Sequence, residues 1–389
     1  MTALVPPAYG QASLSDLLPS VLAGLDGADS GWAAPVLSLP RASRACVFLV
    51  DGLGYDVLAD ADPADAPFLR ELLATGLALD AGFPASTPIS LCSLGTGRPP
   101  GEHGIVGFTM HVPPVPHVLE CLAWTGYGSG VDLSTSLPPD ELQPCEPLLS
   151  VAASAGIIAT VVSLTAHIGS GLTRAAFRGA RFDSIGSFGD LEMRLRLVTR
   201  ALRPEPSLVY TYEARLDTAA HVSGVGSPAW RDALRAADAT AAAIAGVLPR
   251  GTLMLITGDH GAVDVPAGDR VDLATRPELS DGVEWLSGDP RARHVHLARE
   301  GAAGVRARWR DGLGDGWQIL TRDEAIEAGL FGPLVREAVR PRIGDLVAIA
   351  TGSGGLFDSS RFPWELRLVA FHGALTSPEL RVPLLPHEA

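Results

Sequence analysis

Short apolar runs alternate with helical patterns along this chain. Five runs have the length and composition of buried strands, and they lie at 45–50, 156–164, 207–212, 252–257 and 366–371. Apolar residues recur at helical spacing in four other segments, which lie at 14–22, 68–73, 191–202 and 230–247. A continuous apolar run is typical of a strand buried on both faces. The alternation therefore predicts an α/β fold, with a mostly parallel central sheet covered by helices on both faces.

The segment between the fourth and fifth of these strands has a pattern of its own. One strand and two helices are expected there, and they lie at 294–297, 302–311 and 321–328. We therefore predict a small α+β cap subdomain at 262–342, inserted into a core that is formed by 1–261 and 343–389.

Polar residues stand where the predicted strands end. In open α/β sheets, ligands bind beyond the carboxyl ends of the strands. Three aspartates and three histidines lie at or shortly after these ends: Asp51, Asp217, His221, Asp259, His260 and His372. Carboxylate oxygens and imidazole nitrogens together suit zinc or a similar transition metal. The sequence therefore predicts a site for two metal ions at this edge of the sheet.

The spacing of these residues is compatible with shared ions. Asp217 and His221 are four residues apart, so on a helix they point to the same side. Asp259 and His260 are adjacent and would face opposite ways on a regular strand. We expect the flanking glycines at 258 and 261 to let the chain bend, so that both side chains reach one ion.

A hydroxyl lies at the start of another predicted helix. Pro88 suits the first helical position, which makes Thr87 the cap residue. Anions are favoured at a helix N-terminus because unpaired N–H groups and the helix dipole point at them. A threonine hydroxyl bound to a metal there could lose its proton and act as a nucleophile.

Composition narrows the possible chemistry. All thirty basic residues are arginine, which excludes a Schiff-base lysine, a Walker-type phosphate loop and a protein kinase. The formal net charge of −14 argues against nucleic acid polymers and anionic membrane surfaces as partners. An anionic substrate would need local positive charge, which two divalent ions would supply.

The chain shows no sign of export or membrane insertion. Its first residues lack the basic flank and apolar run of a signal peptide, and the longest nearly apolar stretch, at 151–166, is too short to span a membrane. Four cysteines without a CxxC spacing predict free thiols. We therefore expect a cytoplasmic protein without a membrane partner.

The ordered motifs resemble a known family. They are Val50-Asp51-Gly52, Phe83 to Thr87, Thr96 to Ile105, Asp217-xxx-His221, Gly258 to Gly261 and His372-Gly373. The set is similar to the type I phosphodiesterase/nucleotide pyrophosphatase family of the alkaline phosphatase superfamily, over about residues 44–385. The resemblance implies an alkaline phosphatase-like fold and two divalent ions, with zinc as the first candidate.

The resemblance also implies roles for single residues. One zinc would be held by Asp217, His221 and His372. The other would be held by Asp51, Asp259 and His260 together with Thr87. Thr87 would attack phosphorus and form a phosphothreonine, which water then hydrolyses.

The implied activity is hydrolysis of a phosphodiester or pyrophosphate bond in a small phosphorylated substrate, such as a nucleotide-like compound. A phosphomonoesterase and a phosphonate (C–P) hydrolase on the same metal site are alternatives. A catalytically silent metal- or ligand-binding homologue is the alternative from a different class. A sulfatase is disfavoured because no Cys-x-Pro-x-Arg motif surrounds position 87.

Three departures from the family concern the substrate. Pro88-Ile89-Ser90 stands where members commonly have an aromatic residue, proline and asparagine, and the segment after His372 lacks the usual aspartate-asparagine pair. The segment 106–109 shows no asparagine to hold a phosphate oxygen, so Arg98, Thr109 and backbone N–H groups are the candidates for that task. His167 is a further candidate for lining the site. We expect specificity to lie in 262–342 and 110–147.

Overall fold

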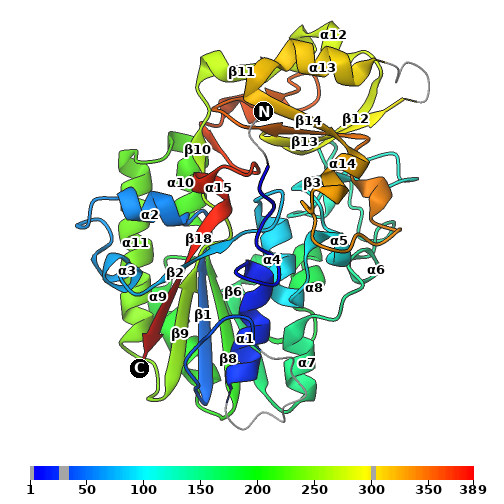
Figure 1. The fold of residues 1–389 in the computed structure, drawn as a ribbon. Coiled ribbons are helices and arrows are strands. Elements are labelled where there is room, and N and C mark those ends of the chain that lie inside the picture. The colour runs from blue at the N-terminus through cyan, green and yellow to red at the C-terminus, as the bar shows by residue number, and fades with distance from the viewer. Residues whose placement is uncertain (1–3, 26–34, 299–303) are drawn as a thin grey trace.

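A seven-stranded sheet forms the centre of the lower body in this computed structural model, which describes residues 4–25, 35–298 and 304–389 (Figure 1). Its strand order is β2 (Leu77–Asp80), β18 (Arg381–Glu388), β9 (Thr252–Thr257), β1 (Arg44–Val50), β8 (Ser207–Glu213), β6 (Ile158–Leu164) and β7 (Arg181–Ile185). β1, β6, β7, β8 and β9 pair in parallel, whereas β18 is antiparallel to both of its neighbours. The expected mostly parallel α/β sheet is confirmed.

Helices cover both faces of this sheet, and β1 shows why its sequence is apolar throughout. Ala45, Val47 and Leu49 belong to one buried cluster, while the alternate side chains of Cys46, Phe48 and Val50 belong to another. The first cluster includes side chains of α1 (Leu17–Gly24), α4 (Thr87–Thr96), α7 (Leu148–Ser154) and α8 (Gly171–Phe177). The second includes side chains of α3 (Pro67–Leu73), α9 (Leu191–Ala201) and α11 (Pro228–Ala245). Both faces of β1 therefore lie in an apolar core.

The last strand of the sheet differs from the expectation. The apolar run 366–371 contributes only β17 (Ala370–Phe371), which pairs with β10 (Val263–Asp264) outside the central sheet. The strand that completes the sheet is β18, whose two prolines argue against a strand. Beyond Leu384 only β9 pairs with β18. One edge is open there, so Pro386 is tolerated.

A second, four-stranded antiparallel sheet lies in the upper part of Figure 1. Its order is β12 (Val283–Asp289), β13 (Ala292–Leu297), β15 (Leu346–Ala350) and β14 (Trp317–Thr321). The expected strand at 294–297 is therefore present, and α13 (Val305–Leu313) and α14 (Arg322–Glu327) correspond to the expected helices. Residues 302–303 of the first helix lie outside the described part. β15, which follows the predicted boundary at 342, pairs with both β13 and β14.

Further short strands and helices lie outside these two sheets. The strands are β3 (Thr109–His111), β4 (Val118–Glu120), β5 (Thr125–Gly126), β11 (Arg270–Asp272) and β16 (Gly355–Phe357). The helices are α2 (Tyr55–Asp60), α5 (Pro100–His103), α6 (Pro139–Leu142), α10 (Arg215–Ser223), α12 (Pro277–Ser280) and α15 (Ser377–Leu380). Figure 1 shows that the parallel strands run upward, so their carboxyl ends face the upper sheet.

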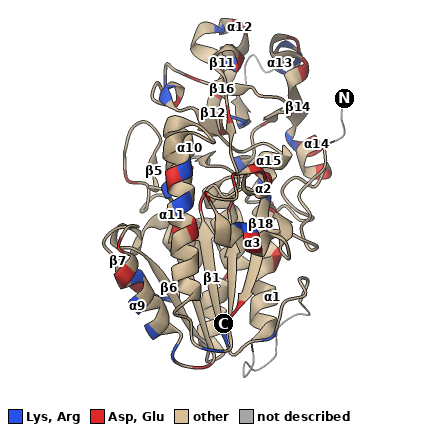
Figure 2. Ribbon diagram, turned by 90° about the vertical axis from the view of Figure 1, so that its left-hand side faces the viewer, with Lys and Arg blue, Asp and Glu red and all other residues tan. Residues whose placement is uncertain are grey.

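Figure 2 shows acidic and basic residues interspersed on the side formed by α9 and α11. Among the helices in the described ranges, none combines the length and the apolar character that crossing a membrane requires. All four cysteines are free thiols.

Candidate metal centre and active site

The six predicted ligands come from separate segments and meet above the carboxyl ends of β1, β8 and β9. Asp51 follows β1, Asp259 and His260 follow β9, and His372 follows β17, while Asp217 and His221 lie on α10. Two groups of possible ligand atoms each fit within 4.8 Å: Asp217, His221 and His372, and Asp51, Asp217 and His260. Asp217 belongs to both groups, so the two candidate metal positions adjoin each other.

Asp259 meets the centre in a different way from the other carboxylates. Its Oδ1 accepts hydrogen bonds from the backbone N–H groups of Gly52 and His260, both at 3.0 Å. Its Oδ2 is buried, has no hydrogen-bond partner, and lies 3.6 Å from Nε2 of His260. The Oδ1 contacts hold the carboxylate in place and leave Oδ2 available for a cation.

Glycines allow the strand ends to approach one another. Gly52 has a φ of +76°, and a Cβ there would lie 2.9 Å from Cα of Asp217. The expected bend between Gly258 and Gly261 is present at Asp259, although neither glycine has a positive φ. A Cβ at Gly258 would instead lie 2.1 Å from the carbonyl oxygen of Leu53, and one at Gly261 would lie 2.0 Å from that of Pro378. Close packing is therefore the reason for these two glycines.

Backbone carbonyls fix the tautomer of the three histidines. Nδ1 of His221 lies 2.7 Å from the carbonyl oxygen of Ala370. Nδ1 of His372 lies 2.8 Å from the carbonyl oxygen of Ala85, and Nδ1 of His260 lies 3.0 Å from the carbonyl oxygen of Gly261. A carbonyl only accepts, so each Nδ1 carries the proton and donates. The lone pair of each Nε2 is then free for a metal, which is the usual arrangement of histidine ligands.

Buried negative charge converges on the same point. Burial raises the pKa of Asp51 well above its usual value, and the carboxylates of Asp259 and Asp217 raise it further. Burial lowers the pKa of His260, but Asp259 and Asp217 outweigh it, so that the net change is upward. Oδ1 of Asp217, like Oδ2 of Asp259, is buried without a hydrogen-bond partner. A cation would offset the charge of carboxylates this close, and the oxygen and nitrogen donors present fit zinc.

Thr87 lies at this centre. Its Oγ1 is 3.1 Å from Nε2 of His260 and 3.5 Å from Oδ1 of Asp51. Thr87 is the first residue of α4, and Ser86 takes the N-cap position that we had assigned to Thr87. The hydroxyl of Ser90 donates to the carbonyl of Asp259 at 2.6 Å, which ties α4 to the end of β9.

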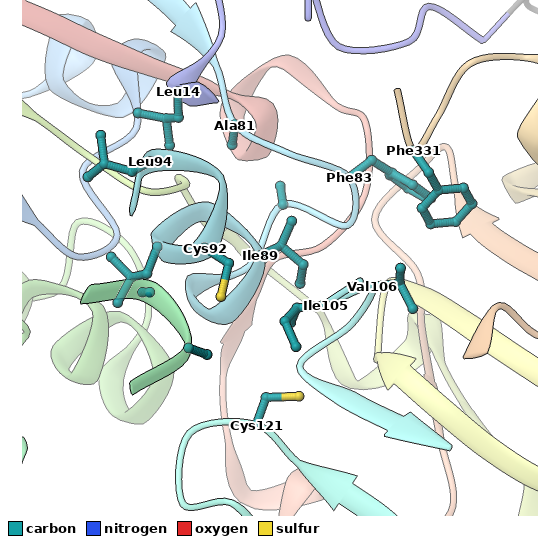
Figure 3. Packing of buried hydrophobic residues seen from close by; sticks show 14 of the residues in the cluster. Leu14, Ala81, Phe83, Ile89, Cys92, Leu94, Ile105, Val106, Cys121 and Phe331 are labelled. Carbon is teal, nitrogen blue, oxygen red and sulfur yellow. The ribbon is translucent and has the colours of Figure 1, made fainter. Parts of the chain in front are cut away.

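The rest of α4 is anchored in the core. Figure 3 shows Ile89, Cys92 and Leu94 among other buried apolar side chains, and Phe83 packs edge-on against Phe331 with ring centroids 5.5 Å apart. Such packing restricts movement of the helix. The Thr87 hydroxyl is therefore held in a fixed position relative to the metal ligands.

Sequence reasoning missed two residues beside the ligands. The Tyr212 hydroxyl donates to Oδ2 of Asp51. Asp289, from β12, is buried next to His372, and burial raises its pKa to about 6. Tyr212 was read only as an apolar strand residue, and Asp289 lies in the inserted segment, where no motif points to the centre.

Two pockets border the centre from different sides. We call the first the Thr87 pocket; it has a volume of about 170 Å³ and its lining includes Thr87, His167, Phe188, Tyr210 and Tyr212. We call the second the His372 pocket; it has a volume of about 300 Å³ and its lining includes Phe108, Tyr127, His221, Trp364 and His372. Leu122 lines both pockets and lies between them.

The three candidate substrate residues have different positions. His167 lines the Thr87 pocket, with Nδ1 2.8 Å from Oγ of Ser163. Arg98 is not brought to the site: its side chain is 59% exposed, it pairs with Glu102, and it follows the far end of α4, ~15 Å along the helix from Thr87. Thr109 donates its hydroxyl to the carbonyl of Gly288 at 2.8 Å and lines neither pocket.

The arrangement of sheets and helices is similar to that in solved structures of phosphate and phosphonate hydrolases. Murine ectonucleotide pyrophosphatase/phosphodiesterase 5 superposes with a TM-score of 0.67 at 15% identity, over 88% of this chain and 87% of that one. An inactive threonine-to-alanine variant of that protein, in complex with AMP, superposes with a TM-score of 0.65 at 15% identity and with the same coverage. Phosphonoacetate hydrolase from Sinorhizobium meliloti 1021, in complex with phosphonoacetate, superposes with a TM-score of 0.67 at 18% identity, over 91% of this chain and 92% of that one. These likenesses establish an alkaline phosphatase-like fold.

The family follows from the sequence itself. The model of the type I phosphodiesterase/nucleotide pyrophosphatase family matches residues 45–373, which is most of the chain. The chain therefore belongs to this family of hydrolases, as its motifs indicated. None of the curated proteins compared with it matches.

Proposed function

We propose that this protein is a two-metal-dependent phosphodiesterase with Thr87 as its nucleophile. Asp217, His221 and His372 would hold one ion. Asp51, Asp259 and His260 would hold the other, with the Thr87 hydroxyl beside them. Divalent ions at these positions supply positive charge and Lewis acidity, which offset the charge of a phosphate and of an ionising hydroxyl. The observation that carries the proposal is the Thr87 hydroxyl 3.1 Å from Nε2 of His260, at the point where the two ligand groups adjoin.

The protein's own groups would act in two displacements. In the first, the Thr87 oxygen bonds to phosphorus, the bond from phosphorus to the leaving alcohol breaks, and the alcohol oxygen takes up a proton. In the second, water attacks the phosphothreonine, which releases the phosphomonoester and restores the hydroxyl. Backbone N–H groups in the first turn of α4 face the substrate and would hold a phosphate oxygen. They are the remaining candidates for that task, because the chain contains no asparagine and the exposed Arg98 side chain pairs with Glu102 away from the site.

Two further observations support a diesterase. The inactive variant of the murine relative, which carries alanine in place of a threonine, is described in complex with AMP. In the present chain, apolar pockets border Thr87 on one side and His372 on the other. A phosphodiester has two organic substituents that could occupy them, whereas a phosphomonoester has only one.

Activity and metal content, measured on the same preparations, test the proposal. The zinc-loaded wild type should hydrolyse bis-4-nitrophenyl phosphate faster than 4-nitrophenyl phosphate or phosphonoacetate. Thr87→Ala should lose turnover by about 10³-fold or more while it retains its zinc, since the nucleophile is removed and the six ligands remain. Thr87→Ser should retain part of the activity.

Other outcomes would identify the alternatives. Faster hydrolysis of the monoester would indicate a phosphomonoesterase, and release of phosphate from phosphonoacetate alone would indicate a C–P hydrolase. Full zinc content without turnover of any of the three compounds would indicate a silent homologue. Unchanged turnover in Thr87→Ala would exclude Thr87 as the nucleophile.

A further inference from the structure

The His372 pocket has a preformed aromatic wall. Tyr127 packs against Phe362 with ring centroids 4.2 Å apart, against Trp364 at 5.6 Å and against Phe108 at 5.8 Å. Trp364 is 40% exposed, so one face of the wall is open to a ligand. Such a surface favours an apolar or aromatic group.

The charged side chains that line this pocket are all acidic. They are Asp217, Asp289 and Glu365, and no arginine lines the pocket in the described part of the chain. Glu365 is neutralised within the wall, because its carboxylate accepts from Arg293 and from the Tyr127 hydroxyl, both at 2.6 Å. A metal ion would offset Asp217. Apart from that ion, no cationic side chain among the described residues of the pocket lining would face an anionic ligand.

The position of Arg293 explains why it cannot serve as that cation. Its side chain is fully buried and, besides Glu365, donates to the carbonyl of Leu356 at 3.0 Å. The segment in which family members commonly have an asparagine contributes Phe108 to this pocket. The chain also contains no lysine and no asparagine. Among the described residues that line this pocket, none therefore offers an arginine, lysine or asparagine side chain to a second phosphate.

The proposed nucleophile and the ligands of the first proposed ion line different pockets. Thr87 lines the Thr87 pocket, whereas Asp217, His221 and His372 line the other one. In an in-line displacement the leaving group departs on the side opposite the nucleophile. The substituent in the His372 pocket is therefore the one expelled, and the substituent in the Thr87 pocket stays on phosphorus.

We infer that the His372 pocket is a subsite for an uncharged, apolar leaving alcohol. The preferred substrates are then phosphodiesters whose expelled group is aromatic or aliphatic, in preference to nucleoside triphosphates, whose expelled pyrophosphate is anionic. This inference rests on the proposed diesterase function. It adds the substrate class, and it assigns specificity to Phe108, Tyr127 and Trp364.

A matched pair of substrates tests the charge requirement. Methyl 4-nitrophenyl phosphate and methyl 3-carboxy-4-nitrophenyl phosphate share the retained methyl group and differ by one carboxylate on the leaving group. We expect kcat/KM of the wild type to be at least about tenfold higher for the uncharged leaving group, because unfavourable charge juxtaposition weakens binding. Equal rates, or a preference for the carboxylated compound, would overturn the inference.

A charge introduced at the rim should change this ratio. Val222 lines the His372 pocket at 62% exposure, so Val222→Arg adds a cation there without loss of core packing. The ratio should fall by about tenfold in Val222→Arg. It should remain unchanged in the control Val247→Arg, because Val247 lines neither pocket. A ratio that does not respond to Val222→Arg would contradict the assignment of this pocket.

Binding without turnover separates failure of this inference from failure of the diesterase proposal. Benzyl alcohol and benzoate have similar shapes and differ in charge. In the zinc-loaded protein, benzyl alcohol should bind more tightly than benzoate and change the tryptophan fluorescence, and Trp364→Phe should remove that change. This result together with inactivity on all diesters would refute the diesterase and leave the pocket assignment standing. Tighter binding of benzoate would refute the pocket assignment, whatever the activity.

Discussion

Tyr212 offers the sharpest test of the metal centre, because it contacts a ligand and is not itself one. Its hydroxyl donates to Oδ2 of Asp51, while Oδ1 of the same carboxylate lies 3.4 Å from Nε2 of His260. Tyr212→Phe would remove this donor and keep the ring that packs against His167 at 5.8 Å. The variant therefore isolates one hydrogen bond to one metal ligand.

The expected effect follows from two properties of Asp51. A hydrogen bond to a charged group contributes about 1.5–3 kcal/mol, and partners that orient metal ligands typically contribute 10–100-fold in affinity. The Tyr212 hydrogen bond also lowers the pKa of Asp51, against the larger upward effect of burial. Without it, that pKa rises further and protons compete with the metal at higher pH. We expect about 10–100-fold weaker binding of the second zinc, and a pH midpoint of zinc occupancy that moves upward.

Tyr210 provides a matched control on the same strand. Its hydroxyl is buried but has no hydrogen-bond partner, so Tyr210→Phe removes the same atom without removing a contact. Zinc affinity would be measured by competition with a fluorescent chelator from pH 6 to pH 8.5 for the wild type and both variants. If Tyr212→Phe bound zinc like Tyr210→Phe at every pH, Tyr212 would have no role in orienting Asp51.

Three further predictions concern metal content and stability. Asp217→Ala should lose more zinc than His221→Ala by elemental analysis, because Asp217, which would hold the first ion, also lies within 4.8 Å of ligand atoms of Asp51 and His260 beside the second; equal losses would contradict this shared position. Glu379→Ala should lower the free energy of unfolding by about 3–5 kcal/mol in denaturant titration, since it leaves the buried Arg291 without its partner at 2.7 Å; a loss below 1 kcal/mol would refute this. The pKa of Asp51 is raised in the folded state, so its protonated carboxyl contributes stability to the metal-free fold at low pH. That contribution is lost as the pH rises through the folded-state pKa. Zinc should therefore raise the Tm more at pH 8 than at pH 5, and a larger rise at pH 5 would contradict the charge argument.

The sequence predicted the parts of the fold that local pattern controls. The run 45–50 indicated a strand buried on both faces, and the structure places alternate residues of β1 in two apolar clusters. It did not predict β18, since Pro383 and Pro386 are tolerated only because of which strands lie beside them. The short edge strands β2 and β7 were missed as well. Pairing of this kind depends on residues distant in the chain.

The site, like the fold, was predictable where local sequence pattern determines it and not where residues distant in the chain do. The six candidate ligands and Thr87 were recognisable because they lie on segments that follow predicted strands or begin a helix, in the order of the family's motifs. Other features depend on residues far apart in the chain. These are the place of Asp217 in both groups of ligand atoms, the N–H donor of Gly52 to Asp259 and the hydroxyl donor of Tyr212 to Asp51. Arg98 and Thr109 were reasonable candidates from their chain position. The direction of α4 carries Arg98 away from the centre, and Gly288 accepts the hydroxyl of Thr109.

The proposed mechanism requires that the Thr87 oxygen forms a covalent bond to phosphorus during turnover. The most direct test is rapid acid quenching of the zinc-loaded enzyme during turnover of bis-4-nitrophenyl phosphate, followed by peptide mass spectrometry. We predict a 4-nitrophenyl phosphoryl group on the peptide that contains Thr87, formed within the first turnover and absent from Thr87→Ala. Turnover without any modification of that peptide, together with an active Thr87→Ala variant, would contradict the account.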